Sequence, residues 1–253
     1  MSVNRNTNWE KWGDQKYADV MYRRAIGDLP EMESSKALAR RVGSVWTTGN
    51  SILDVGCGAG HYLRSLRREI GSDFDYTGVD ITPHHLALAR KAFAADARAY
   101  FRHANLFDLN FQDKSFDIAI CTNLMQNLPN IVRPLGELSR VSRRIVVIRL
   151  LCGDRTFLIR DVHSHEPELD ASGEPYAFNY YNIYSRAYID SLVSKLPDVQ
   201  SHSIEADWDY SVENIDNPAL KDSTGAQRTT MIGRYQANGY ILLPWAFLTI
   251  LKS

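Results

Sequence analysis

From residue 51 onward, short apolar runs alternate with stretches of helical spacing, and this alternation limits the fold more than any other feature. The predicted strands are Ser51–Val55, Tyr76–Ile81, Ala99–Ala104, Phe116–Cys121 and Arg144–Leu150. The predicted helices between them are Tyr62–Ile70, Pro83–Ala95 and Ile131–Val141. Strands that alternate with helices form parallel sheets through right-handed crossovers. We therefore predict a doubly wound α/β fold whose mostly parallel, seven-stranded sheet is covered on both faces.

The segments that flank this core are less regular. Helices are predicted over Met32–Val42 and Ser185–Leu196, and strands over Val199–Ala206 and Trp245–Leu251. The stretch Trp208–Asn238 is polar and is predicted to be a loop. A proline inside a central strand removes a ladder hydrogen bond. Because of Pro244, the structure of Gly239–Pro244 stays open.

Charge and cysteine content exclude several classes of partner. The 253 residues include 29 Lys and Arg and 30 Asp and Glu, a formal net charge of -1. Such a balance provides no positive field for a polyanion, so no nucleic-acid partner is expected. The three cysteines form no C-x-x-C pair, so we expect no metal site and a reducing, cytoplasmic location. The most apolar tract, Gly239–Leu251, is shorter than the ~20 residues of a membrane-spanning helix, so no membrane partner is expected.

A glycine-rich loop follows the first predicted strand and precedes a helix. It reads Asp54-Val55-Gly56-Cys57-Gly58-Ala59-Gly60. Glycines at such a turn let the backbone approach a ligand closely. The dinucleotide fingerprint needs another glycine where His61 stands, so a nicotinamide cofactor is disfavoured. The acid that opens the loop also suits a cationic ligand better than a pyrophosphate.

A second acid, Asp80, ends the second predicted strand about 20 residues beyond the loop, where an acid binds ribose hydroxyls in open sheets of this kind. One acid for a charged amino-acid group and another for a ribose together describe S-adenosyl-L-methionine.

These motifs resemble those of the class I S-adenosylmethionine-dependent methyltransferases. The stretch Asp54–Gly60 resembles the family's first motif, and Asp80 resembles its ribose-binding acid. Asp113–Ala119 and Thr122–Pro129 resemble the lead-in to strand four and the segment after it. The resemblance covers residues 51–151 and implies a Rossmann-like methyltransferase fold with S-adenosyl-L-methionine as the cofactor.

The resemblance also implies roles for single residues in the first half of the core. The backbone of Gly56 and Gly58 would border the methionine part of the cofactor, and Gly60 would permit close helix packing. Asp80 would accept hydrogen bonds from both ribose hydroxyls, and Ile81 would cover one face of the adenine.

Five further positions lie in the second half of the core. Asn105 stands where many relatives have an aspartate that accepts from the adenine amino group, and Leu106 would donate its backbone N–H to the ring. Asn123 is assigned to the cofactor side of the pocket. Gln126 and Asn127 stand where many relatives have histidines, so the substrate class of those relatives does not transfer to this chain.

Ligands in this fold bind beyond the carboxyl ends of the parallel strands, so the segments leaving those ends are candidates for acceptor contact. The predicted acceptor-binding residues are Gln126, Asn127, Arg160, Tyr180, Tyr181 and Tyr184. The hypothesised general base of an O-methyl transfer is His163 or His165. An unprotonated amine would need no base. Under the alternative interpretation these tyrosines and histidines are structural.

We interpret the chain as a single methyltransferase domain acting on an O or N atom of a small molecule, such as a sugar or a secondary metabolite. Residues 1–50 would form an N-terminal helical lid, 51–151 the cofactor-binding core, and 152–253 an inserted cap with the C-terminal strands. The apolar cover of the lid would come from Trp9, Trp12, Tyr17 and Tyr22. Under the alternative interpretation the N-terminal segment is an extra helix packed on the sheet edge. The alternatives are a nucleic-acid or protein methyltransferase and a non-catalytic cofactor-binding protein. A homodimer is compatible with the sequence.

Overall fold

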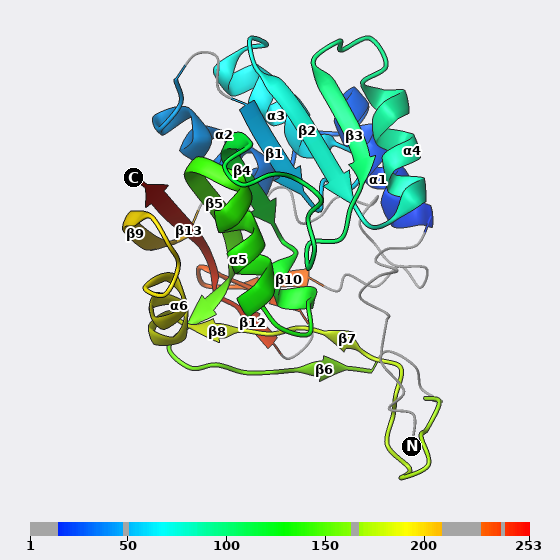
Figure 1. The fold of residues 1–253 in the computed structure, drawn as a ribbon. Helices are drawn as coiled ribbons and strands as arrows, with labels where there is room; N and C mark the ends of the chain where they lie inside the picture. Colours follow the sequence, from blue (N-terminus) through cyan, green and yellow to red (C-terminus); the bar gives the residue numbers. More distant parts are fainter. Residues whose placement is uncertain (1–14, 48–50, 163–166, 209–228, 239–240) are drawn as a thin grey trace.

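The central sheet of the computed structural model has the strand order β3-β2-β1-β4-β5-β13-β9 (Figure 1). The structure describes residues 15–47, 51–162, 167–208, 229–238 and 241–253. The parallel strands are β1 (Ser51–Val55), β2 (Asp75–Asp80), β3 (Ala99–His103), β4 (Phe116–Thr122) and β5 (Ser142–Gly153). Both β13 (Trp245–Lys252), which is antiparallel to β5, and β9 (Val199–Ala206), which is antiparallel to β13, extend the sheet. The predicted doubly wound, mostly parallel sheet is confirmed.

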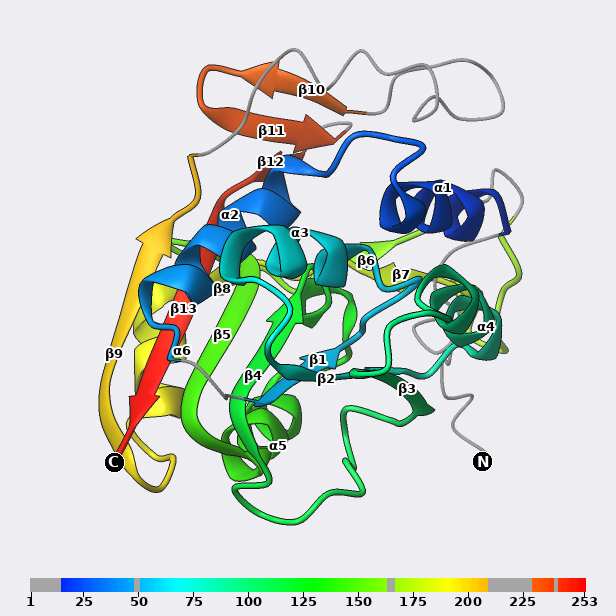
Figure 2. The same ribbon diagram turned by 90° about the horizontal axis from the view of Figure 1, so that it is seen from above.

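Helices cover both faces of this sheet, as Figure 2 shows from above. One face carries α2 (Glu33–Ser44), α3 (His61–Ile70) and α4 (Pro83–Ala92). The other face carries α5 (Val132–Val141) and α6 (Arg186–Val193). An additional helix, α1 (Gln15–Ile26), packs against α3 and α4 rather than against the sheet.

Alternation along the strands explains why two separate apolar layers form. In β1, the side chain of Ile52 packs in the layer under α2, α3 and α4, whereas that of Leu53 packs in the layer under α5. Successive side chains of a strand point to opposite faces, so a run that is apolar at every position can bury both faces of a sheet. The central strands of the sheet therefore lie in the middle of the molecule, between two apolar layers.

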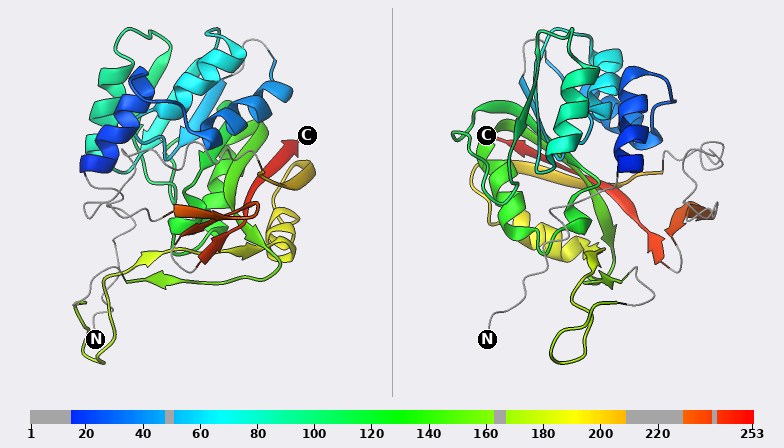
Figure 3. Two further views of the ribbon diagram at one scale, coloured as in Figure 1. Left: turned by 180° about the vertical axis from the view of Figure 1, so that it is seen from behind. Right: turned by 90° about the vertical axis from the view of Figure 1, so that its right-hand side faces the viewer.

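Two small sheets lie beyond the end of the main sheet toward which the parallel strands run (Figure 3). One pairs β6 (Arg160–Asp161) with β7 (Asn179–Tyr180), and nearby β8 (Tyr184–Ser185) pairs with β5. The other consists of β10 (Thr229–Ile232), β11 (Tyr235–Asn238) and β12 (Ile241–Leu243). The prediction of a loop up to Asn238 is therefore wrong for residues 229–238, which form a hairpin around Gly233. Within the described residues, no helix is long and apolar enough to cross a membrane.

Candidate functional site

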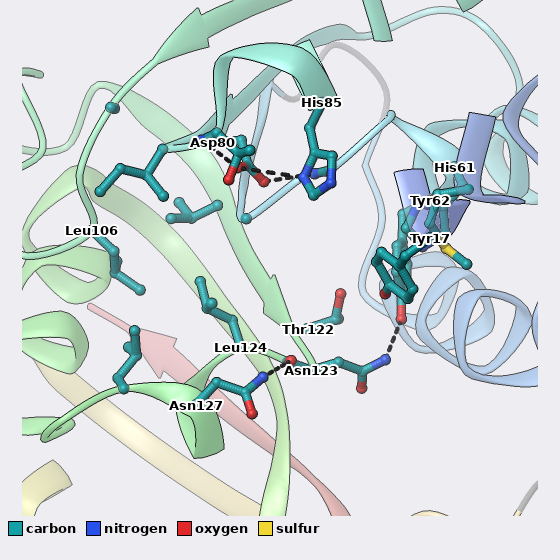
Figure 4. A pocket seen from close by; sticks show the side chains of 18 of the residues that line it. Tyr17, His61, Tyr62, Asp80, His85, Leu106, Thr122, Asn123, Leu124 and Asn127 are labelled. Atoms are coloured by element: carbon teal, nitrogen blue, oxygen red, sulfur yellow. Dashed lines mark hydrogen bonds and ion pairs between the residues drawn. The ribbon is translucent and has the colours of Figure 1, made fainter. Parts of the chain in front are cut away.

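A pocket opens at the carboxyl ends of β1, β2 and β4, and Figure 4 shows its lining. It encloses about 850 Å³ of space free of protein atoms, including the part open to solvent. The lining residues are Tyr17, Met21, Met32, Val55, Gly56, Gly58, His61, Tyr62, Asp80, Ile81, Thr82, His85, Ala104, Asn105, Leu106, Thr122, Asn123, Leu124, Asn127 and Leu128.

The glycine loop forms the floor of this pocket. The N–H groups of Gly56 and Cys57 both donate to the carbonyl oxygen of Val79, at 2.8 and 3.0 Å, which ties the loop to β2. Gly56 has φ +80° and Gly58 has φ +54°, backbone angles that residues other than glycine rarely adopt. A Cβ on Gly56 would also lie only 2.8 Å from Leu124 Cδ2. The absence of a side chain at Gly56 therefore lets Leu124 pack directly against the loop.

Gly60 serves packing rather than the pocket. It precedes α3 with φ +81°, and a Cβ there would lie 2.9 Å from the ring of Phe93 and 3.3 Å from that of Phe101. Gly60 is not among the lining residues. Its placement agrees with the packing role that the resemblance implied.

Asp80 lies in the pocket at the end of β2. One carboxylate oxygen accepts from Gly58 N at 2.9 Å and the other from Thr82 N at 2.8 Å. The imidazole of His85 lies 3.8 Å from the second oxygen. Burial opposes ionisation, but the contact with His85 and the hydrogen bonds from Thr82 N and Gly58 N hold the pKa of Asp80 below its ordinary value. A carboxylate has about four acceptor positions, so Asp80 keeps capacity for two further donors.

Thr82 occupies the N-cap position of α4, but its side chain makes no capping bond. The backbone N–H of Thr82 donates to the carboxylate of Asp80. This bond gives Asp80 a second fixed contact and starts α4 directly beside the pocket.

Asp54 lies beneath the glycine loop and outside the pocket lining. Its side chain is buried, with 1% of the residue exposed. One oxygen accepts from the Tyr76 hydroxyl at 2.6 Å, and the other has no hydrogen-bond partner. Burial raises the pKa of Asp54 to about 7, the Tyr76 hydrogen bond lowers it, and the nearby charge of Asp80 raises it. Direct contact of Asp54 with a ligand stays a prediction.

The loop after β3 supplies Asn105 and Leu106, which both line the pocket, as does Ile81 from the β2 side. The side-chain oxygen of Asn105 accepts from Phe107 N at 2.9 Å, so it stabilises its own turn. A carbonyl oxygen has two lone pairs, and one remains for a ligand.

Asn123, directly after β4, has φ +56° and lines the pocket opposite the glycine loop. Its side-chain N–H donates to the hydroxyl oxygen of Tyr62 at 3.0 Å. Its side-chain oxygen accepts from Arg149 of β5. Arg149 is buried, and its contact with a pocket residue was not predicted from the sequence.

Tyr17 of helix α1, expected as apolar cover from the N-terminal segment, lines the pocket. Sequence reasoning missed several other lining residues, among them Met21 of α1 and Met32, which precedes α2. Two buried histidines, His61 and His85, each have a ring nitrogen without a hydrogen-bond partner. Burial, with the charges of Arg24 and His85, lowers the pKa of His61 to about 3, so that this ring is neutral at pH 7.

The predicted acceptor residues are only partly brought together. Asn127 lines the pocket. Gln126 is buried behind it, and its side-chain N–H donates to Asn123 O at 2.6 Å. The remaining predicted acceptor residues lie in or beside the small β6–β7 sheet and β8, outside the pocket lining, namely Arg160, Tyr180, Tyr181 and Tyr184. Both His163 and His165 lie outside the described residues.

The lining suits a cationic nucleoside. Asp80 is the only Asp, Glu, Lys or Arg among the described lining residues, so their formal charge favours a cation. Its carboxylate can accept from vicinal hydroxyls, while Leu106 and Leu128 provide an apolar wall. Gly56 and Gly58 add bare backbone to the lining.

Comparisons with known proteins agree with this geometry. Residues 52–144 match a family model described as a methyltransferase domain. The demethylmenaquinone methyltransferase of Staphylococcus aureus (strain MRSA252) is 30% identical over 93 residues, which is 37% of this chain. The match spans only 39% of that relative's length.

Solved structures show the fold at low identity. The partner of the Haloferax volcanii Trm112 methyltransferase activator in a solved complex superposes with a TM-score of 0.61 at 18% identity, covering 99% of both chains. A Haemonchus contortus phosphoethanolamine N-methyltransferase 2, solved with S-adenosylhomocysteine, superposes with a TM-score of 0.58 at 18% identity. That match covers 87% of this chain and 52% of the other.

Proposed function

We propose that this chain, whose residues 52–144 match the model of a methyltransferase domain, transfers the methyl group of S-adenosyl-L-methionine to an O or N atom of a small molecule. One observation carries the proposal. Gly56, Gly58 and Asp80, which the resemblance marked as cofactor residues, line one pocket at the carboxyl ends of the parallel strands. Ligands of open α/β sheets bind at this edge.

The chain's own residues would bind and orient the cofactor. Asp80 would accept hydrogen bonds from both ribose hydroxyls, and Ile81 and Leu106 would enclose the adenine. The bare backbone of Gly56 and Gly58 would let the methionine part lie against the loop. Bound there, S-adenosyl-L-methionine supplies a methyl carbon already activated by its sulfonium. What remains for the protein is to align donor and acceptor and to exclude water.

An uncharged small molecule is the acceptor class that we propose. Among the described lining residues there is no Lys or Arg that would pair with a phosphate or a carboxylate. Tyr17, Met21 and Met32 instead offer apolar and aromatic surface on the α1 side. The name of the Staphylococcus aureus relative, a demethylmenaquinone methyltransferase, also supports a small acceptor.

For an O-methyl transfer, we propose that His163 or His165 acts as the general base, because histidine takes up a proton near neutral pH. Turnover of His163→Ala and His165→Ala would be measured at saturating acceptor. Near wild-type rates in both variants would exclude this role.

We also propose that the N-terminal segment covers the donor, because Tyr17 and Met21 of α1 line the pocket. Closure of such a segment would keep water away from the reacting atoms. Of its predicted aromatic cover, Trp9 and Trp12 lie outside the described residues.

The test is calorimetry with S-adenosylhomocysteine and, separately, with NAD, followed by methyl release with a panel of metabolites. We expect the wild type to bind S-adenosylhomocysteine but not NAD, and Asp80→Ala to bind it at least tenfold more weakly. Asp108→Asn, at an exposed carboxylate of the loop after β3, is the control and should bind like the wild type. Failure of the wild type to bind S-adenosylhomocysteine would refute the proposal, and binding without transfer to any acceptor would favour a non-catalytic role.

A further inference from the structure

A buried ion pair lies behind the pocket wall. Arg149 of β5 and Asp207, just after β9, form a contact of 2.6 Å between Arg149 Nε and Asp207 Oδ2. Their side chains are only 2% and 3% exposed. The guanidinium also lies over the ring of Trp245, 4.1 Å from its centroid. Burying two charges costs desolvation energy that their attraction often fails to recover, so the pair is a poor explanation for stability alone.

The same guanidinium reaches the pocket through Asn123. Arg149 Nη1 donates to the side-chain oxygen of Asn123, while Asn123 N donates to Arg149 O at 3.0 Å. Asn123 thus bonds to Arg149 through both its backbone and its side chain. These bonds hold a residue with φ +56°, a conformation that asparagine tolerates better than most residues.

The charge of Arg149 also fixes which way the amide of Asn123 points. An arginine is always protonated and only donates, so it requires the amide oxygen on its side. The amide nitrogen is then directed at the hydroxyl oxygen of Tyr62, 3.0 Å away. That oxygen therefore accepts, and Ser34 Oγ of α2 lies 3.1 Å from it. A continuous chain of polar contacts connects Asp207 with α2 and passes two pocket residues.

The position of Asn123 determines how the pocket wall meets the glycine loop. Its neighbour Leu124 lies directly over Gly56, where a Cβ would approach Leu124 Cδ2 to 2.8 Å. Gln126 and Asn127 both donate side-chain hydrogen bonds to Asn123 O, at 2.6 and 3.2 Å. A shift of Asn123 would therefore move the whole wall from Leu124 to Asn127 relative to Gly56.

We propose that Arg149, neutralised by Asp207, is a positioning residue of the donor pocket that acts by holding Asn123 and the adjoining wall against the glycine loop. The inference rests on the proposed function, because the ligand whose affinity it controls is S-adenosyl-L-methionine or its product. Arg149 itself does not line the pocket.

The experiment compares S-adenosylhomocysteine affinity, by calorimetry, with stability, by urea unfolding without ligand. The main variant is Arg149→Met/Asp207→Leu, which removes both charges and leaves neither unpaired. We expect its Kd to rise about tenfold, which is ~1.4 kcal/mol. The matched control is Arg41→Met/Glu205→Gln, which removes another Arg–carboxylate pair, between α2 and β9, and should leave the Kd unchanged.

A double-mutant cycle with Asn123→Ala separates positioning from a general structural effect. If Arg149 acts through Asn123, the triple variant Asn123→Ala/Arg149→Met/Asp207→Leu should have a Kd less than twofold higher than that of Asn123→Ala alone. Additive losses in Kd, or an unchanged Kd in Arg149→Met/Asp207→Leu, would overturn the proposal.

Arg149→Lys provides a second route if the double variant fails to fold. It keeps a positive charge beside Asp207, but its single ammonium cannot reproduce the fork that reaches both Asp207 and Asn123. Its Kd should rise at least threefold, and an unchanged Kd would overturn the inference. Absence of binding by the wild type would instead refute the proposed function.

Discussion

The variant Asp54→Asn tests how much the ionisation of the buried Asp54 carboxylate lowers the free energy of unfolding. The pKa of Asp54 is raised from 3.8 to about 7, mainly by burial, because the charged form loses its hydration there. At 1.36 kcal/mol per pKa unit, this difference corresponds to ~4 kcal/mol. An asparagine of nearly the same shape can still accept from the Tyr76 hydroxyl and carries no proton to lose.

The direction follows from proton linkage. Between pH 4 and pH 7 the folded state holds the proton of Asp54 while the unfolded state has released it, so the free energy of unfolding falls as the pH rises. His61 acts in the opposite direction, because its pKa is lowered from 6.5 to about 3 and the folded state binds fewer protons over that range. Because both proteins contain His61, its contribution cancels when the free energy of unfolding of the wild type is subtracted from that of Asp54→Asn at each pH. The remaining pH dependence is that of Asp54.

The assay is equilibrium urea unfolding of wild type and Asp54→Asn at pH 5, 6, 7 and 8, with Asp108→Asn at an exposed carboxylate as the control. We expect the stability of Asp54→Asn relative to wild type to increase by ~3 kcal/mol from pH 5 to pH 8. The control should show no such trend. A difference between Asp54→Asn and wild type that stays constant over this range would refute the reasoning.

Further predictions concern neighbouring groups. Tyr76→Phe removes the hydrogen bond that lowers the pKa of Asp54. The free energy of unfolding of this variant should therefore fall more steeply than that of wild type as the pH rises from 5 to 8. An equal slope would contradict this. Gly56→Ala places a side chain at φ +80° and should weaken S-adenosylhomocysteine binding at least tenfold by calorimetry. The control is Gly136→Ala within helix α5, which should leave binding unchanged and raise the free energy of unfolding by ~1 kcal/mol. Tyr17→Ala should raise the Kd for S-adenosylhomocysteine about threefold if α1 covers the donor, and wild-type affinity would contradict that role.

The core of the fold was predictable because its signals are local. Strand β1 has the predicted bounds Ser51–Val55, since a short apolar run ending at a glycine loop leaves few alternatives. Helix α4 ends at Ala92, three residues earlier than predicted, because the next residue, Phe93, packs close to Gly60. That contact joins segments more than 30 residues apart, and helical spacing contains no information about it.

The hairpin at residues 229–238 was missed for a related reason. Its strands are only four residues long and come from a polar stretch, and in β10 Ile232 is 57% exposed. Ala237 is the apolar residue of β11 that is buried, and one small side chain gives no apolar alternation. Gly233, with φ +59°, was the one available signal of a hairpin turn.

The candidate site was predictable where motifs follow the parallel strands. Gly56, Gly58 and Asp80 line the pocket because strand ends in a parallel sheet meet at one edge. The predicted tyrosines do not line it, because the chain after β5 leads to separate small sheets. The sequence contained one signal of the buried contact that was not used. Arg149 is a charged residue within an apolar strand, and such a residue needs a partner when it is buried.

The placement of β13 affects how the protein is made. This strand, residues 245–252, lies between β5 and β9, although β5 ends about 90 residues earlier. While a ribosome is still synthesising the intervening residues, the backbone edge of β5 has no neighbour and can pair with another nascent chain. Pairing of β13 with β5 therefore covers an edge that stays open until residues 245–252 have been synthesised.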